Sequence, residues 1–322
     1  MVAKWGAARA IGAAVIISIV AGCSSADYAA PIKTFADATT DADKALADLN
    51  KTATDKYTVF LAERARTDLH VQVTPMSDEC ADDSKRCRIL FKNLDKDGKQ
   101  AVYPPEPLLG KSVALMGDIR AYAQNLAALI ADDSAAQAVT DVNATLGSIE
   151  KLANTLAEAD GQPKGSVPSF ATPVGAAVNW AIGEYAERVK LAGLRHATKT
   201  ADPIIQRAGD IFAKEAVFGS ILQRTELATA FEQRIDAYRF NRTDQAKLDQ
   251  AVAAAQRYDD LLRAQPDATF KKMGEAHAAL TAALNNSNVS WSEAFAKIQE
   301  FAAKAEQLAK ITQDLIALNQ KK

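Results

Sequence analysis

Apolar side chains recur every three or four residues over most of this chain, which is the spacing of one face of an α-helix. The clearest stripe occupies residues 28–60 and consists of Tyr28, Ile32, Phe35, Thr39, Ala42, Leu46, Leu49, Ala53, Tyr57 and Phe60. Its intervals are close to the heptad spacing of helices that pack along their length. The pattern predicts one long amphipathic helix that ends near Arg66.

A second long stripe lies at the end of the chain and is formed by Trp291, Phe295, Ile298, Ala302, Ala305, Leu308, Ile311, Leu315 and Leu318. It predicts a helix of about 30 residues, roughly 45 Å long at 1.5 Å per residue. Further helices are expected at about 109–131, 134–159, 174–199, 203–240, 243–264 and 267–285. The predicted breaks are Asp202-Pro203, Asn241–Thr243 and Gln265–Asp267, while the proline-rich stretch 161–173 is expected to be a loop or linker.

The period changes between residues 68 and 107. Leu69, Val71 and Val73 alternate with polar residues, and the stretches 87–92 and 100–103 are typical of two further short strands. Tyr103 is followed by Pro104, Pro105 and Pro107, which cannot lie inside a helix. We therefore expect a small β-insert at 68–107, placed between helices.

The composition agrees with long helices packed side by side. Hydrophobic residues make up 48% of the chain, but aromatic residues only 7%, and alanine is abundant. Alanine favours helix and permits close helix approach, although it buries less apolar area than leucine does. The predicted fold is mainly α, an elongated antiparallel bundle of long helices with a small disulfide-pinned β-insert. Whether 23–160 and 174–322 form one bundle or two stays open.

The first 22 residues have the organisation of a secretory signal. Lys4 and Arg9 precede an apolar run from Ala10 to Ala21. The run is about a dozen residues long, shorter than the roughly 20 that a membrane-spanning helix needs. The signal ends in Val-Ala-Gly-Cys, with Gly22 before Cys23, and this resembles the lipobox of bacterial lipoproteins, although Val20 replaces the more usual leucine.

The resemblance implies that the signal peptide is cleaved between Gly22 and Cys23 and that Cys23 carries acyl groups such as palmitate. Several chains on one residue form a durable tether, since each buried methylene contributes about 0.8 kcal/mol. By the sorting rule of the same family, Ser24 in place of aspartate favours the outer membrane, so we expect residues 23–322 to be lipid-anchored there and to face the periplasm.

The charge balance disfavours nucleic acid as a partner. The chain has 38 basic and 40 acidic residues, and loss of residues 1–22 removes Lys4 and Arg9, which leaves 36 basic residues and a net charge of −4. A protein of this charge does not neutralise a phosphate backbone. The remaining cysteines, Cys80 and Cys87, are an even pair at short spacing and are predicted to form one disulfide in an oxidising compartment. A metal site would need further cysteine or histidine ligands, and only His70 lies nearby.

No convergent catalytic or metal-binding set is found. His70, His196 and His277 are scattered, and we expect each to be solvated or satisfied by neighbours. Residues 93–98 resemble the start of a calcium loop, but position 12 of that loop is Pro104 rather than glutamate. Ser220 lacks the second glycine of a nucleophile elbow. We therefore predict no cofactor.

Three hypotheses follow. The leading one is a non-enzymatic, membrane-anchored structural or protein-interaction module, with Tyr103, Pro104 and Pro105 as the candidate partner-binding surface. The second is a protein that holds a small ligand or metal in the bundle, lined by Trp180, Tyr185 and one of the two downstream histidines. A hydrolase of cell-envelope polymer is a lesser alternative, which would need two facing carboxylates.

Overall fold

The computed structural model describes residues 25–76, 80–81, 87–93, 100–103, 109–131, 134–161, 186–286 and 288–319. The expected signal segment, Cys23, the two prolines after Tyr103 and the aromatic pair Trp180 and Tyr185 lie outside these residues. The predictions made for them are therefore carried forward as predictions.

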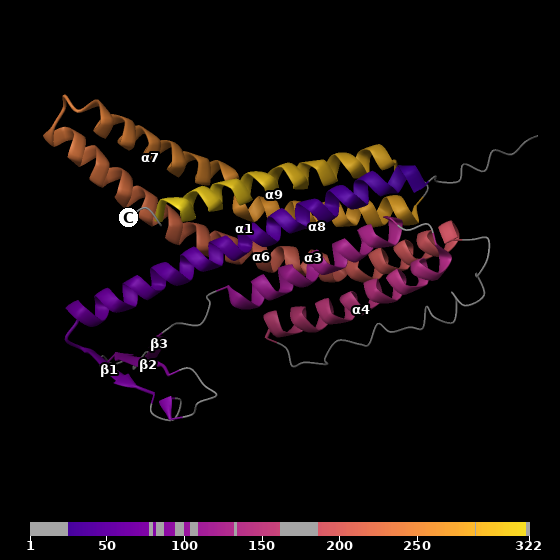
Figure 1. Ribbon diagram of the computed structural model, residues 1–322, viewed down its shortest axis with the longest axis horizontal. Coiled ribbons are helices and arrows are strands. Elements are labelled where there is room, and N and C mark those ends of the chain that lie inside the picture. Colours follow the sequence, from indigo (N-terminus) through magenta and orange to yellow (C-terminus); the bar gives the residue numbers. More distant parts are fainter. Residues whose placement is uncertain are drawn as a thin grey trace, which may run out of the picture.

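Long helices dominate the described chain (Figure 1). They are α1 (Ser25–Thr67), α3 (Gly110–Ala131), α4 (Ala135–Ala159), α6 (Ala186–Phe240), α7 (Gln245–Ala264), α8 (Pro266–Asn285) and α9 (Trp291–Asn319). The strands are β1 (Val71–Pro75), β2 (Ile89–Asn93) and β3 (Gln100–Tyr103). The predicted fold class, a bundle of long helices with a small disulfide-pinned β-insert, is confirmed.

Six of these helices surround one core. α1 packs against α9 and α3, α3 against α4, α4 against α6, α6 against α8, and α8 against α9. Buried side chains from the first and second halves of the chain belong to the same cluster; its largest members include Tyr28, Phe35, Tyr122, Phe212, Phe270 and Phe301. The two halves therefore share a core, which the sequence left open.

The predicted break at Asp202-Pro203 is wrong, because α6 continues through Pro203 from Ala186 to Phe240. A proline inside a helix loses one backbone hydrogen bond and costs about 3 kcal/mol. Pro203 is exposed, whereas its neighbours Ile204 and Ile205 are buried in the core. Burial of two such side chains contributes about 1.5–3 kcal/mol each, so packing offsets the cost of the proline.

Glycines allow α6 and α8 to approach closely. A Cβ added at Gly209 would lie 2.9 Å from the carbonyl oxygen of Phe270, and one added at Gly274 would lie 2.8 Å from Oε1 of Gln206. The amide of Gln206 also donates to the Gly274 carbonyl oxygen over 2.7 Å. Any side chain at Gly209 would therefore push the two helices apart.

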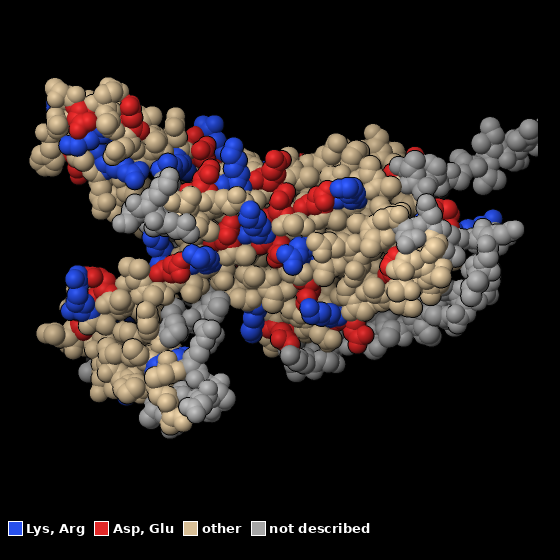
Figure 2. All heavy atoms as spheres, viewed as in Figure 1, with Lys and Arg blue, Asp and Glu red and all other residues tan. Residues whose placement is uncertain are grey.

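The bundle opens into two arms at one end (Figure 1). One arm is the last part of α1 with the β-sheet, and the other is the hairpin formed by the end of α6 with α7. The arms diverge near the point where Gly219 of α6 lies against Leu49 of α1 and Leu109. Figure 2 shows open space between the two arms on this face of the molecule.

The insert is a three-stranded antiparallel sheet in the order β1-β2-β3. In the register, Val73 lies opposite Phe91, and Phe91 lies opposite Ala101. Opposite residues share a face, so one face carries Val71, Val73, Ile89, Phe91, Ala101 and Tyr103 and is apolar. The Cys80–Cys87 disulfide closes the connection between β1 and β2, as predicted.

Candidate functional site

Within the described part of the chain, the large apolar side chains that are exposed gather on the two arms. Among the described residues, every large apolar side chain classed as exposed belongs to the first arm (Val59, Phe60, Leu69, Val73 and Ile89) or to the second (Val217, Ile221, Phe240, Val252 and Leu262). Single exposed apolar residues are ordinary, but their concentration on one end of a molecule makes that end a candidate interaction surface.

Phe60 shows where the sequence prediction was incomplete. It belongs to the apolar stripe expected to face the core, yet it is 55% exposed, and its neighbour Val59 is 63% exposed. The core stripe of α1 ends earlier because no bundle helix accompanies its last turns. Two adjacent apolar residues cannot both face one neighbour of a helix, and this was the signal available in the sequence.

A hollow of about 280 Å³ lies between the end of α1 and the sheet. It is lined by Tyr57, Phe60, Leu61, Arg64, Val71, Phe91, Gln100 and Ala101. Tyr57 stacks on Phe60 with ring centroids 6.2 Å apart. The apolar face of the sheet therefore covers the helix only in part, and it leaves Val73 and Ile89 exposed beside the hollow.

Tyr103, the one described member of the predicted binding surface, lies on this apolar face. Its ring meets the edge of Phe91 with centroids 6.1 Å apart, and the side chain is half-buried. The structure thus brings Tyr103 together with Phe91 of β2, which itself lines the hollow.

Among the described residues that line the hollow, Arg64 is the one that carries a charge. Its Nε lies 3.5 Å from Oδ2 of Asp68. The pKa of Asp68 lies below its ordinary value, mainly because the backbone N–H of His70 donates to its carboxylate and secondarily because of Arg64. Asp68 therefore stays ionised, and its carboxylate holds the turn between α1 and β1 by accepting from the N–H of His70.

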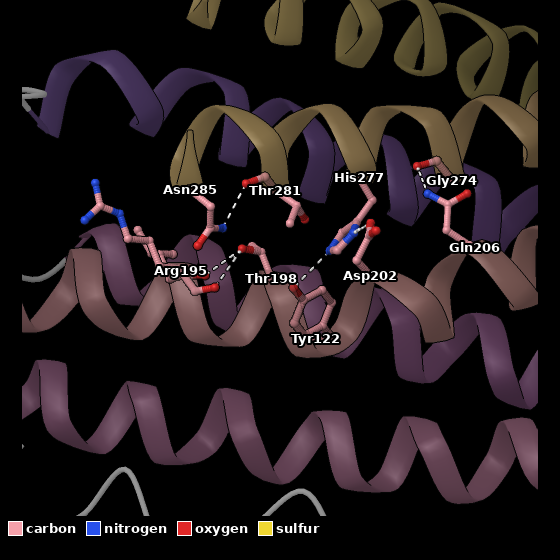
Figure 3. A network of polar contacts seen from close by, with 10 residues as sticks. Tyr122, Arg195, Thr198, Asp202, Gln206, Gly274, His277, Thr281 and Asn285 are labelled. Carbon is pink, nitrogen blue, oxygen red and sulfur yellow. Dashed lines mark hydrogen bonds and ion pairs between the residues drawn. The ribbon is translucent and has the colours of Figure 1, made fainter. Parts of the chain in front are cut away.

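A buried polar network joins three helices within the core (Figure 3). Nδ1 of His277 on α8 lies 2.9 Å from Oδ1 of Asp202 on α6, and its Nε2 lies 3.0 Å from the hydroxyl of Tyr122 on α3. The carboxylate of Asp202 can only accept a hydrogen bond, so Nδ1 of His277 carries the ring proton and donates it to Asp202. Nε2 of His277 then accepts from the hydroxyl of Tyr122. Burial, with a smaller contribution from Asp202, raises the pKa of Tyr122 well above 10.0.

The order carboxylate, imidazole, hydroxyl is also found in proton relays, but here the terminal oxygen, the hydroxyl of Tyr122, is enclosed in the core. Tyr122 and His277 are both 0% exposed, and His277 packs against the ring of Phe35. The two hollows described for this protein are lined by neither residue. The geometry supports a structural role, in which hydrogen bonds of His277 link α3, α6 and α8. His277 is thus satisfied by neighbours, as the sequence analysis expected.

A shallower groove of about 550 Å³ runs between α1 and α3 near the start of α1. Its lining is mostly alanine, with Ile130 as the largest apolar side chain and the ion pair Lys33–Asp37 at its edge. Small side chains on both helices produce this groove.

Other candidates from the sequence stay separate. Ser220 is buried, and its hydroxyl donates to the carbonyl oxygen of Val217, an ordinary contact within a helix. His70, His196 and His277 lie on different elements, and no group of three residues suited to a metal occurs within the described ranges. None of the described helices is long and apolar enough to span a bilayer.

Comparison with known proteins gives no match: no protein-family model, no curated protein and no solved structure is similar to this chain.

Proposed function

We propose that this protein is a lipid-anchored envelope protein that binds a protein partner with its two arms. The observation that carries the proposal is the confinement of exposed large apolar side chains to the arms. Burial of such side chains at an interface contributes about 25 cal/mol per Å², so a partner that covers them gains binding free energy.

The long helix α1 connects the proposed lipid anchor with the first arm. It begins at Ser25, two residues after Cys23, and ends at Thr67, where the chain enters the β-insert. Its 43 residues span about 65 Å at 1.5 Å per residue. An acylated Cys23 would therefore hold one end of the molecule at a lipid surface, with the arms at the far end.

The proposed tether rests on the lipobox-like sequence, which implies an outer-membrane anchor that faces the periplasm. Several acyl chains on Cys23 would hold the protein at the membrane. The mature charge of −4 would add no attraction to anionic lipid, so the acyl groups must supply the membrane affinity.

A protein partner suits the surface better than a small ligand does. The exposed side chains come from several elements, over residues 59–89 and 217–262, and they do not line one enclosed pocket of the kind that holds a small ligand. The alanine-lined groove between α1 and α3 favours a second candidate, the binding of a small apolar ligand, because about 550 Å³ falls in the range of ligand sites.

The proposal is tested with Cys23→Ser and with an arm variant that combines Phe60→Ser and Ile221→Ser. Both arm positions are exposed, so the substitutions should leave the thermal unfolding of the bundle unchanged. Cys23→Ser should lack acyl mass and leave the membrane fraction. The arm variant should stay on the membrane but lose its partner in crosslinking from whole cells followed by affinity capture.

Ala296→Ser is the matched control, because Ala296 is exposed on α9 within the bundle. This control should retain the partner. Partner capture that is equal in the arm variant and the control would exclude the arms as the binding surface. Acyl mass absent from the wild-type protein would exclude the tether.

A further inference from the structure

The direction of the backbone groups along the sheet can be assigned from one hydrogen bond. The N–H of Met76 donates to the carbonyl oxygen of Arg88 over 2.9 Å, and these residues continue the β1–β2 register by one position. In an antiparallel ladder, such bonded pairs alternate with pairs whose backbone groups point away from each other. Residues 72 and 74 therefore bond to β2, while residues 71, 73 and 75 point to the outer edge of β1.

Two features of β1 agree with this assignment. The N–H of Val71 points away from β2 and donates to the carbonyl oxygen of Asp68 over 3.1 Å. Pro75, which has no N–H, stands at an outward position where none is needed for the sheet. Within the described part of the insert, Val73 is the donor left on the outer edge of β1, and this edge is a poor site for another strand.

The outer edge of β3 is different. By the same alternation, Ala101 and Tyr103 bond to β2, and Gln100 and Val102 turn both their N–H and their carbonyl groups outward. β3 contains no proline, and within the described ranges no strand pairs with this edge. An edge that presents two donors and two acceptors in alternation is complementary to an extended backbone.

The hollow described above lies over the apolar face of the sheet and reaches β3, where Gln100 and Ala101 line it. A strand added antiparallel to β3 would place the residues opposite Ala101 and Tyr103 on the apolar face of the sheet. Ala101 is small and lines the hollow together with Tyr57, Phe60 and Phe91. The side chain opposite Ala101 would therefore enter an aromatic-lined space of about 280 Å³.

Charge complementarity limits the partner further. Arg64 is the charged residue among the described lining of the hollow, and its side chain is 38% exposed. Asp68 lies near its Nε at 3.5 Å, so the guanidinium has further donors for another carboxylate. An acidic side chain close to the apolar one would meet those donors.

We propose that an extended segment of a partner protein adds to β3 as a fourth strand, with a large apolar or aromatic side chain in the hollow and an acidic residue beside Arg64. This inference rests on the proposed function and deepens it, since it names how the first arm recognises its partner. The backbone of Gln100 and Val102 supplies register, and the hollow supplies selectivity.

The probe is a library of displayed random decapeptides selected on the full-length protein. Selected sequences should carry apolar residues at alternate positions with an acidic residue nearby. When a selected peptide is added, the backbone amide of Val102 should exchange hydrogen more slowly, whereas exposed amides of α9 should be unaffected.

Val102→Pro removes an outward N–H without removing a bond to β2, and Val102→Thr is the matched control that keeps the N–H and the β-branched side chain. Val102→Pro should weaken peptide binding at least tenfold, and Val102→Thr should change it less than threefold. The unliganded exchange of the Ala101 and Tyr103 amides reports whether each variant retains the sheet.

Selection of no peptide above background, or selected peptides that leave the exchange of Val102 unchanged, would overturn strand addition. So would equal binding by the two variants. These failures can be distinguished from a failure of the proposed function. If only strand addition is wrong, a cellular partner still crosslinks to the arms of Val102→Pro. If the arms bind nothing, crosslinking is absent from the wild-type protein as well.

Discussion

At the scale of single residues, the core is fixed by contacts between positions far apart in the chain. His277 meets Tyr122, 155 residues earlier, and Asp202, 75 residues earlier. Each member of this network satisfies a group that would otherwise be buried without a partner, and an unsatisfied buried polar group costs about 1–3 kcal/mol. The network therefore specifies how α3, α6 and α8 meet.

Tyr122→Phe should reduce the free energy of unfolding at neutral pH by about 1–3 kcal/mol, because Nε2 of His277 loses its donor. The same variant should change the response to alkali. Since the folded pKa of Tyr122 lies above its unfolded value of about 10, the folded state holds that proton more tightly, and the contribution to stability is lost as pH rises above 10.

Urea unfolding of the wild type and Tyr122→Phe at pH 7, 9 and 10.5 measures both effects. The stability difference between the two proteins should be constant up to pH 9 and become smaller at pH 10.5. A difference that grows with pH would show that Tyr122 ionises more readily in the folded protein, contrary to its enclosed position.

The sequence shows that the histidines are scattered, but it could not pair His277 with its partners. Tyr122 belongs to an apolar pattern, and nothing local connects it with His277. Phe60 gives the opposite lesson, since its place in the stripe predicted burial and the structure exposes it. Periodicity assigns a residue to a face of a helix but does not say whether another element covers that face.

At the scale of elements, helix periodicity predicted most of the fold. The helix from Ser25 to Thr67 and the short strands of the insert lie close to where the hydrophobic pattern placed them. The continuous α6 was missed, because local rules end a helix before Pro203 whereas burial of Ile204 and Ile205 sustains it. The hollow beside β3 was also missed, because it depends on strand register and on the position of α1.

Close packing of α6 on α8 gives a prediction with an internal control. Gly209→Ala should reduce the free energy of unfolding by about 1–3 kcal/mol, because its Cβ would lie 2.9 Å from a backbone oxygen that cannot rotate away. Gly147→Ala should raise it by up to about 1 kcal/mol, since Gly147 lies inside α4 with nothing within 4 Å of an added Cβ.

Thermal or urea denaturation of the two variants measures this contrast. Because both substitutions add the same methyl group to a helix, the intrinsic helix preference of alanine cancels in the comparison. Equal stabilisation by the two substitutions would show that α6 and α8 are not in close contact at Gly209.

At the scale of the whole molecule, the bundle separates two tasks. Its core is closed by aromatic and alanine side chains, and the large exposed apolar side chains among the described residues lie on the two arms. The proposed lipid anchor precedes the opposite end of α1. With the proposed anchor in place, the length of α1 would keep the arms away from the membrane and leave them free to meet the proposed partner.

The most direct test of this account is site-specific photocrosslinking in intact cells. A photoreactive phenylalanine analogue replaces Phe60 on the first arm, Ile221 on the second arm, or Ala296 on the bundle, all of which are exposed. The account predicts a discrete crosslinked protein from Phe60 and Ile221 and none from Ala296. Crosslinks from Ala296 alone, or the same products from all three positions, would contradict it.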